Sequence, residues 1–172
     1  RCDWDEVCPR EISNPDETLR QVEIYVLGNP PYLGARSSKF TAEMKADREL
    51  ALGDVPSINE IDYIACWLFK AASFIRGFQC SAGFVSTNSV CQGEQAALIW
   101  YPLVGEDAPI ELGFAHTSFK WTNNAIGNAG VTCVILGIRN RSNAPKLLYS
   151  GDTLQNVGFI NVYLRELPPV WV

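Results

Sequence analysis

The feature that most constrains the fold is a short apolar run, Ile24 to Leu27, which leads directly into Gly28-Asn29-Pro30-Pro31-Tyr32. A run of this kind that stops at glycine and proline predicts a β-strand followed by a turn. Each proline fixes its own φ and pushes the preceding residue into extended geometry, so the turn is rigid. Since ligands bind at the carboxyl ends of strands in open α/β sheets, we expect Asn29 to hold its side-chain amide at a binding edge.

The acceptors in this turn suit a planar amino group. The Asn29 side chain and the Pro30 carbonyl both accept hydrogen bonds, and neither can be deprotonated. An amino nitrogen on an aromatic ring is a poor nucleophile, because its lone pair is delocalised into the ring. Two acceptors that take both of its hydrogens would favour the tetrahedral geometry that frees the lone pair. The alternative is that Asn-Pro-Pro is only a turn that ends a strand.

The tetrapeptide Asn29 to Tyr32 resembles the catalytic motif of methyltransferases that modify exocyclic amino groups, above all that of adenine in DNA. Three later blocks make residues 1–165 similar to the adenine-specific methyltransferase region of large single-chain type II restriction-modification enzymes of the IIL or IIG kind. In that family one polypeptide carries nuclease, methyltransferase and target-recognition parts. The blocks are Phe84-Val85-Ser86-Thr87-Asn88-Ser89, Gln92-Gly93-Glu94-Gln95 and Phe114-Ala115-His116-Thr117-Ser118-Phe119-Lys120-Trp121.

The resemblance implies a catalytic role for the turn and a methyl donor beside it. Asn29, Pro30, Pro31 and Tyr32 would form the catalytic turn. Gly28 and Asn29 would lie against the cofactor, S-adenosylmethionine. Methyl transfer from a sulfonium depends on alignment more than on an acid or a base, so a general base is not required.

The resemblance also implies how the substrate is held. A target adenine must leave the duplex to reach such a site, and Tyr32 would stack on the flipped base. A second aromatic residue is expected in a long loop over residues 117–129, with Phe119 as the best match and Trp121 as the alternative. Asn88, at the end of a neighbouring predicted strand, could contact the target or shape the pocket.

Two other functions stay open at this stage. Glutamine and ribosomal-RNA methyltransferases carry the same four letters as the turn, so an RNA or protein amino-methyltransferase is one alternative. A non-catalytic module for DNA docking or assembly is the other. The intact tetrapeptide and the later blocks favour the DNA methyltransferase.

The order of predicted elements indicates an α/β fold. Strands are expected at 22–28, 80–86, 110–116 and 130–138, and helices at 41–52, 61–75 and 92–101. Ser57 with Glu60 suggests a capping box before the second helix, and Pro102 should stop the third. We expect a mostly parallel sheet with helices on both faces and its last two strands antiparallel. The resemblance implies a Rossmann-like methyltransferase fold of strand order 3-2-1-4-5-7-6, of which this chain supplies strands four to seven.

The domain organisation follows from this interpretation. We expect residues 1–141 to be the catalytic half of the methyltransferase domain and residues 142–172 to connect it to a target-recognition domain. The chain begins with Arg1 rather than Met, which suggests a piece of a longer polypeptide with its cofactor loop upstream. The isolated piece should then be inactive, and it could self-associate through an exposed first strand.

Composition narrows the partners. The net charge of −5 argues against this piece gripping DNA unaided, because phosphate contacts dominate nucleic-acid affinity. Double-stranded DNA is therefore expected to bind through the parent protein. With six cysteines, no Cys-x-x-Cys and one histidine, no metal site is predicted. Reduced thiols and no membrane-length apolar run are typical of a cytoplasmic protein, here bacterial or archaeal.

Overall fold

The structure is a computed structural model that describes residues 23–53, 55–76, 78–121 and 130–167. Its strands are β1 (Ile24–Gly28), β2 (Cys80–Thr87), β3 (Ile110–Trp121), β4 (Val131–Asn140), β5 (Lys146–Ser150) and β6 (Thr153–Val157). The helices are α2 (Ala42–Leu52), α3 (Ala65–Ile75) and α4 (Gly93–Val104), with two short 3-10 helices, η2 (Ile58–Glu60) and η3 (Asn88–Cys91). No described helix is long and apolar enough to cross a membrane.

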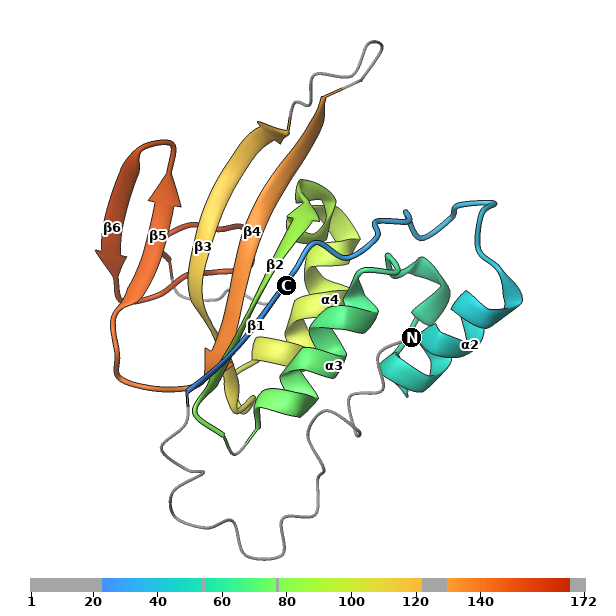
Figure 1. Cartoon of the computed structure of the whole chain (residues 1–172), viewed down its shortest axis with the longest axis horizontal. Coiled ribbons are helices and arrows are strands. Elements are labelled where there is room, and N and C mark those ends of the chain that lie inside the picture. Colours follow the sequence, from blue (N-terminus) through green and yellow to red (C-terminus); the bar gives the residue numbers. More distant parts are fainter. Residues whose placement is uncertain (1–22, 54, 77, 122–129, 168–172) are drawn as a thin grey trace, which may run out of the picture.

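All the described strands form one sheet in the order β1-β2-β4-β3-β5-β6 (Figure 1). β1 and β2 are parallel, β4 is antiparallel to both β2 and β3, and β3 is parallel to β5. The carboxyl ends of β1, β2, β3 and β5 therefore lie along the same edge of the sheet. The first four strands have the order and directions expected for strands four, five, seven and six of the methyltransferase fold, so this prediction is confirmed.

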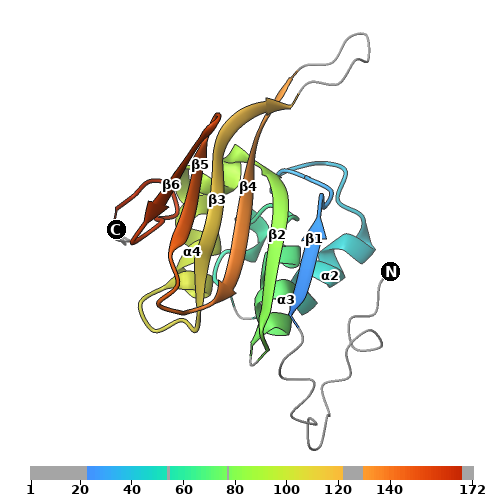
Figure 2. The same ribbon diagram turned by 60° about the vertical axis from the view of Figure 1, so that its left-hand side comes forward.

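The helices α3 and α4 cover the same face of this sheet, and within the described part of the chain no helix covers the other face, in contrast to the expectation of helices on both faces (Figure 2). The strand sequence β1, β2, β3 advances across the sheet in one direction. Right-handed crossovers between parallel strands then place both connecting helices on the same side. The buried core lies between these helices and the sheet, with Leu68, Ile75, Trp100 and Leu136 among its members. The opposite side of the sheet is called the open face below.

Two predicted helix boundaries are wrong. Ser57 has φ 56° and makes no side-chain capping bond, and α3 begins only at Ala65. The residues between them form the 3-10 helix η2 and an irregular segment, to which Arg48 of α2 and Gln95 of α4 make hydrogen bonds. α4 continues past Pro102 to Val104, because tertiary packing buries Leu103 in the core and outweighs the local preference.

The chain after β4 forms more structure than its sequence predicts. β5 pairs with β3, and the β5–β6 hairpin extends the sheet beyond the four expected strands. The division of the chain at residue 141 stays a prediction, although residues 146–157 belong to this same sheet. β1 forms the other edge among the described strands, and its Tyr25 and Leu27 side chains are exposed.

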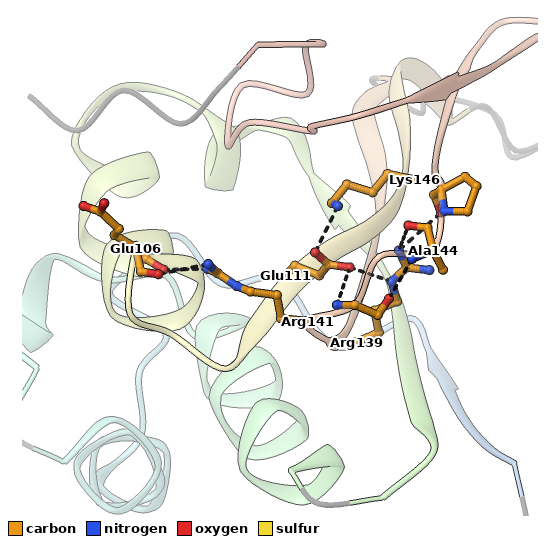
Figure 3. A network of polar contacts seen from close by, with 9 residues as sticks. Glu106, Glu111, Arg139, Arg141, Ala144 and Lys146 are labelled. Atoms are coloured by element: carbon orange, nitrogen blue, oxygen red, sulfur yellow. Dashed lines mark hydrogen bonds and ion pairs between the residues drawn. The ribbon is translucent and has the colours of Figure 1, made fainter.

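An ion-pair network fastens this hairpin to the sheet (Figure 3). The Glu111 carboxylate of β3 pairs with Arg139 Nε of β4 at 2.9 Å and with Lys146 Nζ of β5 at 3.0 Å. Arg141 donates to the carbonyls of Gly105 and Glu106 at the end of α4, both at 2.9 Å. Each strand from β3 to β5 thus contributes a charged group to one buried or half-buried cluster.

Candidate active site at the carboxyl edge of the sheet

The turn after β1 holds its polar groups in a defined arrangement. Pro30 is buried, whereas Asn29 is exposed at the sheet edge. The Tyr32 hydroxyl donates a hydrogen bond of 2.5 Å to Asn29 Oδ1. Tyr32, the last residue of the predicted motif, thus orients the side chain of Asn29, the first. The Asn29 amide oxygen is held at the carboxyl end of β1.

The Tyr32 hydroxyl also lies near the thiol of Cys133 on β4. Burial raises the pKa of Tyr32 above its ordinary value, and the neighbouring Cys133 adds to that rise. The hydroxyl is consequently protonated at neutral pH and can act as the donor to Asn29. Cys133 itself is only 1% exposed, and burial raises the pKa of its thiol as well, so it is a neutral contact.

Cys133 is the point at which the predicted site residues meet. Its Cα is paired with Thr87, the last residue of β2, and with Phe119 of β3. Asn88 follows Thr87 directly at the start of η3. The register thus places the end of β2 and Phe119 of β3 on either side of Cys133, and Tyr32 brings the turn after β1 close to the same residue.

Aromatic side chains continue from this point along the open face. The ring centroid of Phe119 lies 5.2 Å from that of His116 and 6.3 Å from that of Trp121. His116 stacks in turn on Tyr149 of β5, with centroids 6.3 Å apart and planes within 2°. His116 Nδ1 is also 2.8 Å from the Thr117 carbonyl oxygen, which supports a structural role for this histidine.

Phe119 and Trp121 lie on β3 itself, so the predicted loop over 117–129 is wrong in its first part. β3 extends to Trp121 and pairs with β4 up to Val131. An irregularity in the pairing between His116 and Phe119 re-aims the strand there. Trp121 is 44% exposed and Phe119 is half-buried. The rest of the expected loop, residues 122–129, lies outside the described residues.

Sequence reasoning missed two members of this edge, Cys133 and Tyr149. Cys133 stands in an apolar run of the sequence, where a free cysteine is typical of a small buried apolar residue. The signal that could have separated it is strand alternation: Val134, Leu136 and Ile138 face the helices, so Cys133 faces the open side. Tyr149 lies in a segment for which no strand was predicted.

No group of three or more possible metal ligands occurs among the described residues. The donor set of the edge is an amide, a phenol and a neutral thiol. Groups of this kind can bind and orient a neutral partner by hydrogen bonds and stacking.

This sheet order, with an Asn-Pro-Pro-Tyr turn at the carboxyl end of β1, defines the class: a Rossmann-like methyltransferase fold. Residues 1–150 match the family described as the MmeI DNA-methyltransferase domain, and the chain belongs to this family. The chain is thus a methyltransferase region of the restriction-modification type, which confirms the predicted resemblance.

Two relatives illustrate the similarity. DNA methyltransferase A of Bacillus subtilis (strain 168) is 39% identical over 167 residues, which is 96% of this chain and 18% of that protein. The structure of the type IIL restriction-modification enzyme MmeI in complex with DNA matches with a TM-score of 0.76 and 38% identity. That match covers 86% of this chain and 20% of MmeI. The chain therefore spans about a fifth of the length of these relatives.

Proposed function

We propose that this chain carries the catalytic turn of an adenine-specific DNA methyltransferase within a larger restriction-modification protein. The observation that carries the proposal is the Asn29 amide oxygen, held at the carboxyl edge of the sheet by the Tyr32 hydroxyl at 2.5 Å. The family match and the DNA in the MmeI structure support DNA as the substrate class.

The turn would act by accepting hydrogen bonds from the target amino group. Asn29 Oδ1 and the Pro30 carbonyl would each take one N–H, which favours the tetrahedral nitrogen that attacks. Pro31 keeps Pro30 extended, and both prolines restrict the backbone. The two acceptors are therefore placed before the substrate arrives, and preorganised donors and acceptors of this kind lower the barrier most.

S-adenosylmethionine, which the family implies, would supply the methyl group. Gly28 and Asn29 fit a position beside it, since both stand at the open end of the edge strand β1 and Asn29 is exposed. The glycine-rich loop that holds this cofactor in the family has no match in the sequence. The larger part of the cofactor site is therefore expected from another part of the parent protein.

The aromatic residues would hold the flipped base. Tyr32 supplies one ring at the edge, and Phe119 stands across Cys133 from it. Trp121 follows Phe119 on β3 and Asn88 follows Thr87 at the end of β2, and both would contact the target base or its neighbours. The net charge of −5 assigns most of the phosphate contacts to other domains of the same polypeptide. The setting of this chemistry is the bacterial or archaeal cytoplasm.

The test is an Asn29→Ala variant of the full-length protein, with Asn156→Ala as the control. Asn156 is an exposed asparagine of β6. Unmethylated genomic DNA, RNA and protein are each incubated with labelled S-adenosylmethionine, and the modified nucleosides are identified by mass spectrometry. We expect N6-methyladenine in DNA from the wild type and the control, and a loss of about 100-fold to 1,000-fold from Asn29→Ala.

The outcomes separate the candidate functions. A methyl group on RNA or on protein glutamine would replace the DNA proposal by that alternative. N4-methylcytosine in place of N6-methyladenine would agree with methylation of an exocyclic amino group but would contradict adenine as the target base. Methylation by Asn29→Ala at the wild-type rate would remove the turn from the mechanism.

A further inference from the structure

Leu33, the residue that follows the Asn-Pro-Pro-Tyr turn, is held on both its backbone groups by one segment. Its N–H donates to Asp62 Oδ1 at 3.3 Å, and its carbonyl accepts from the Tyr63 N–H at 3.2 Å. The N–H and the carbonyl of one residue belong to two consecutive peptide units, so these bonds restrain the backbone on both sides of the Leu33 Cα. The exit of the catalytic turn is therefore fastened to the residues just before α3.

Asp62 is suited to serve as this anchor. It is 5% exposed, and the same Oδ1 that accepts from Leu33 also accepts from the Ile64 N–H at 3.2 Å. Burial raises the pKa of this carboxyl, while its bonds to the backbone N–H groups of Ile64, Leu33 and Tyr63 lower it. A buried acceptor that serves several backbone donors has little freedom to move.

Gln95 lies in the first helical turn of α4 and holds the backbone of Asp62 in place. Its Oε1 accepts from the Asp62 N–H at 3.0 Å, and its Nε2 donates to the Glu60 carbonyl. One amide side chain thus bridges the backbone on both sides of Ile61. The last residue of the Gln92-Gly93-Glu94-Gln95 block is thereby linked to the Asn-Pro-Pro-Tyr turn through a continuous chain of hydrogen bonds.

Helix α2 supports the segment 59–63 from another side. Arg48 is buried, and it donates to the Asn59 side chain at 2.6 Å and to the Ile61 carbonyl at 3.4 Å. The segment 59–63 is therefore braced by α2 and α4 and carries Leu33 on its outer side. A rigid support of this kind transmits the position of α4 to the site at Asn29 and Tyr32.

We propose that Asp62 and Gln95 are positioning residues for methyl transfer, which keep the Asn29 and Tyr32 side chains in register with Cys133 and Phe119. The inference rests on the proposed function. Neither residue touches the substrate, so each acts through Leu33 on the orientation of the turn. Loss of either anchor lets the turn shift, and a displacement of about 1 Å at a reacting centre costs on the order of 100-fold in rate.

The test uses the full-length protein under single-turnover conditions with saturating DNA and saturating S-adenosylmethionine. The variants are Asp62→Ala, Gln95→Ala and the conservative Asp62→Asn, whose Oδ1 can still accept from Leu33 and Ile64. We expect methyl transfer to slow by about 10-fold to 100-fold in both alanine variants. Asp62→Asn should restore the rate to within a few-fold of wild type. Dissociation constants for DNA and cofactor, measured separately, should change little.

Two matched controls separate positioning from general stability. Asn161 is 7% exposed, and its Oδ1 also accepts from two backbone N–H groups, those of Tyr163 and Arg165. Asn161→Ala should lower the melting temperature as much as Asp62→Ala and leave the transfer rate of the folded protein unchanged. Glu94→Ala, an exposed neighbour of Gln95 on the same helical turn, should be neutral in both measurements.

The result that overturns the inference is a normal transfer rate in Asp62→Ala and Gln95→Ala while Asn29→Ala is inactive. An equal loss of rate in Asn161→Ala would also overturn it, since the effect would then follow stability alone. If Asn29→Ala is itself as active as wild type, the proposed function fails instead, so the two failures are distinguishable.

Discussion

Glu111 offers the sharpest test of how the fold is held together, because its removal leaves two cations without their partner. Its side chain is 10% exposed, and it pairs with Arg139 and Lys146, which are 21% and 14% exposed (Figure 3). It also accepts from the Ser142 N–H at 3.4 Å. The perturbation is Glu111→Ala, with Glu111→Gln as the variant that keeps the side-chain length and one acceptor oxygen but loses the charge and the second acceptor.

The expected loss of local stability depends on which interactions Arg139 and Lys146 retain after Glu111 is replaced. Removal of one partner from a buried ion pair costs about 3–5 kcal/mol. Arg139 retains bonds to the carbonyls of Ala144 and Pro145, and Lys146 remains 5.9 Å from the centre of the Phe159 ring. We therefore expect a local loss near the lower end, about 3 kcal/mol. In amide exchange that corresponds to roughly 100-fold faster opening of the strands involved.

The assay is hydrogen–deuterium exchange with mass spectrometry on the full-length protein. Peptides from β3, β4 and β5 should lose protection in Glu111→Ala, those from α2 should not, and Glu111→Gln should lie in between. The control is Arg36→Ala, because the Arg36–Glu60 pair is 80% and 42% exposed and exposed pairs contribute little. Equal protection of β5 in Glu111→Ala and Arg36→Ala would refute the reasoning.

Three further predictions concern the site and the edge strand. Tyr32→Phe removes the donor to Asn29 and should slow methylation by about 2-fold to 10-fold, the worth of one net hydrogen bond; an unchanged rate would show that the amide is oriented without it. Phe119→Ala should weaken methylation by roughly 5-fold to 100-fold with a nearly unchanged melting temperature; a large fall in melting temperature with normal activity would make it a core residue. The isolated chain should self-associate in sedimentation experiments through the edge at β1, less so as Leu27→Lys, and a clean monomer at high concentration would contradict this.

The sequence alone was sufficient for the strand and turn over residues 24–32 and for the α/β class, while the order of the first four strands came from the family resemblance. The strand and turn depend on short-range rules: an apolar run that ends in Pro-Pro is a strand and a rigid turn, whatever surrounds it. The amphipathic spacing around Leu68 and Ile75 likewise predicted a helix against the sheet. Both residues are fully buried.

Only the tertiary structure decided what surrounds that turn. The approach of Tyr32 to Cys133 joins segments about a hundred residues apart in sequence, and the pairing of Cys133 with Phe119 depends on the register of β3 against β4. No local pattern encodes either of them. The β5–β6 hairpin escaped prediction for the same reason, because its strands are stabilised by β3 and by Glu111 rather than by their own propensity. The anchors Asp62 and Gln95 are ordinary polar residues in sequence. Their meaning arises from long-range hydrogen bonds, which form only when α4 packs beside the turn.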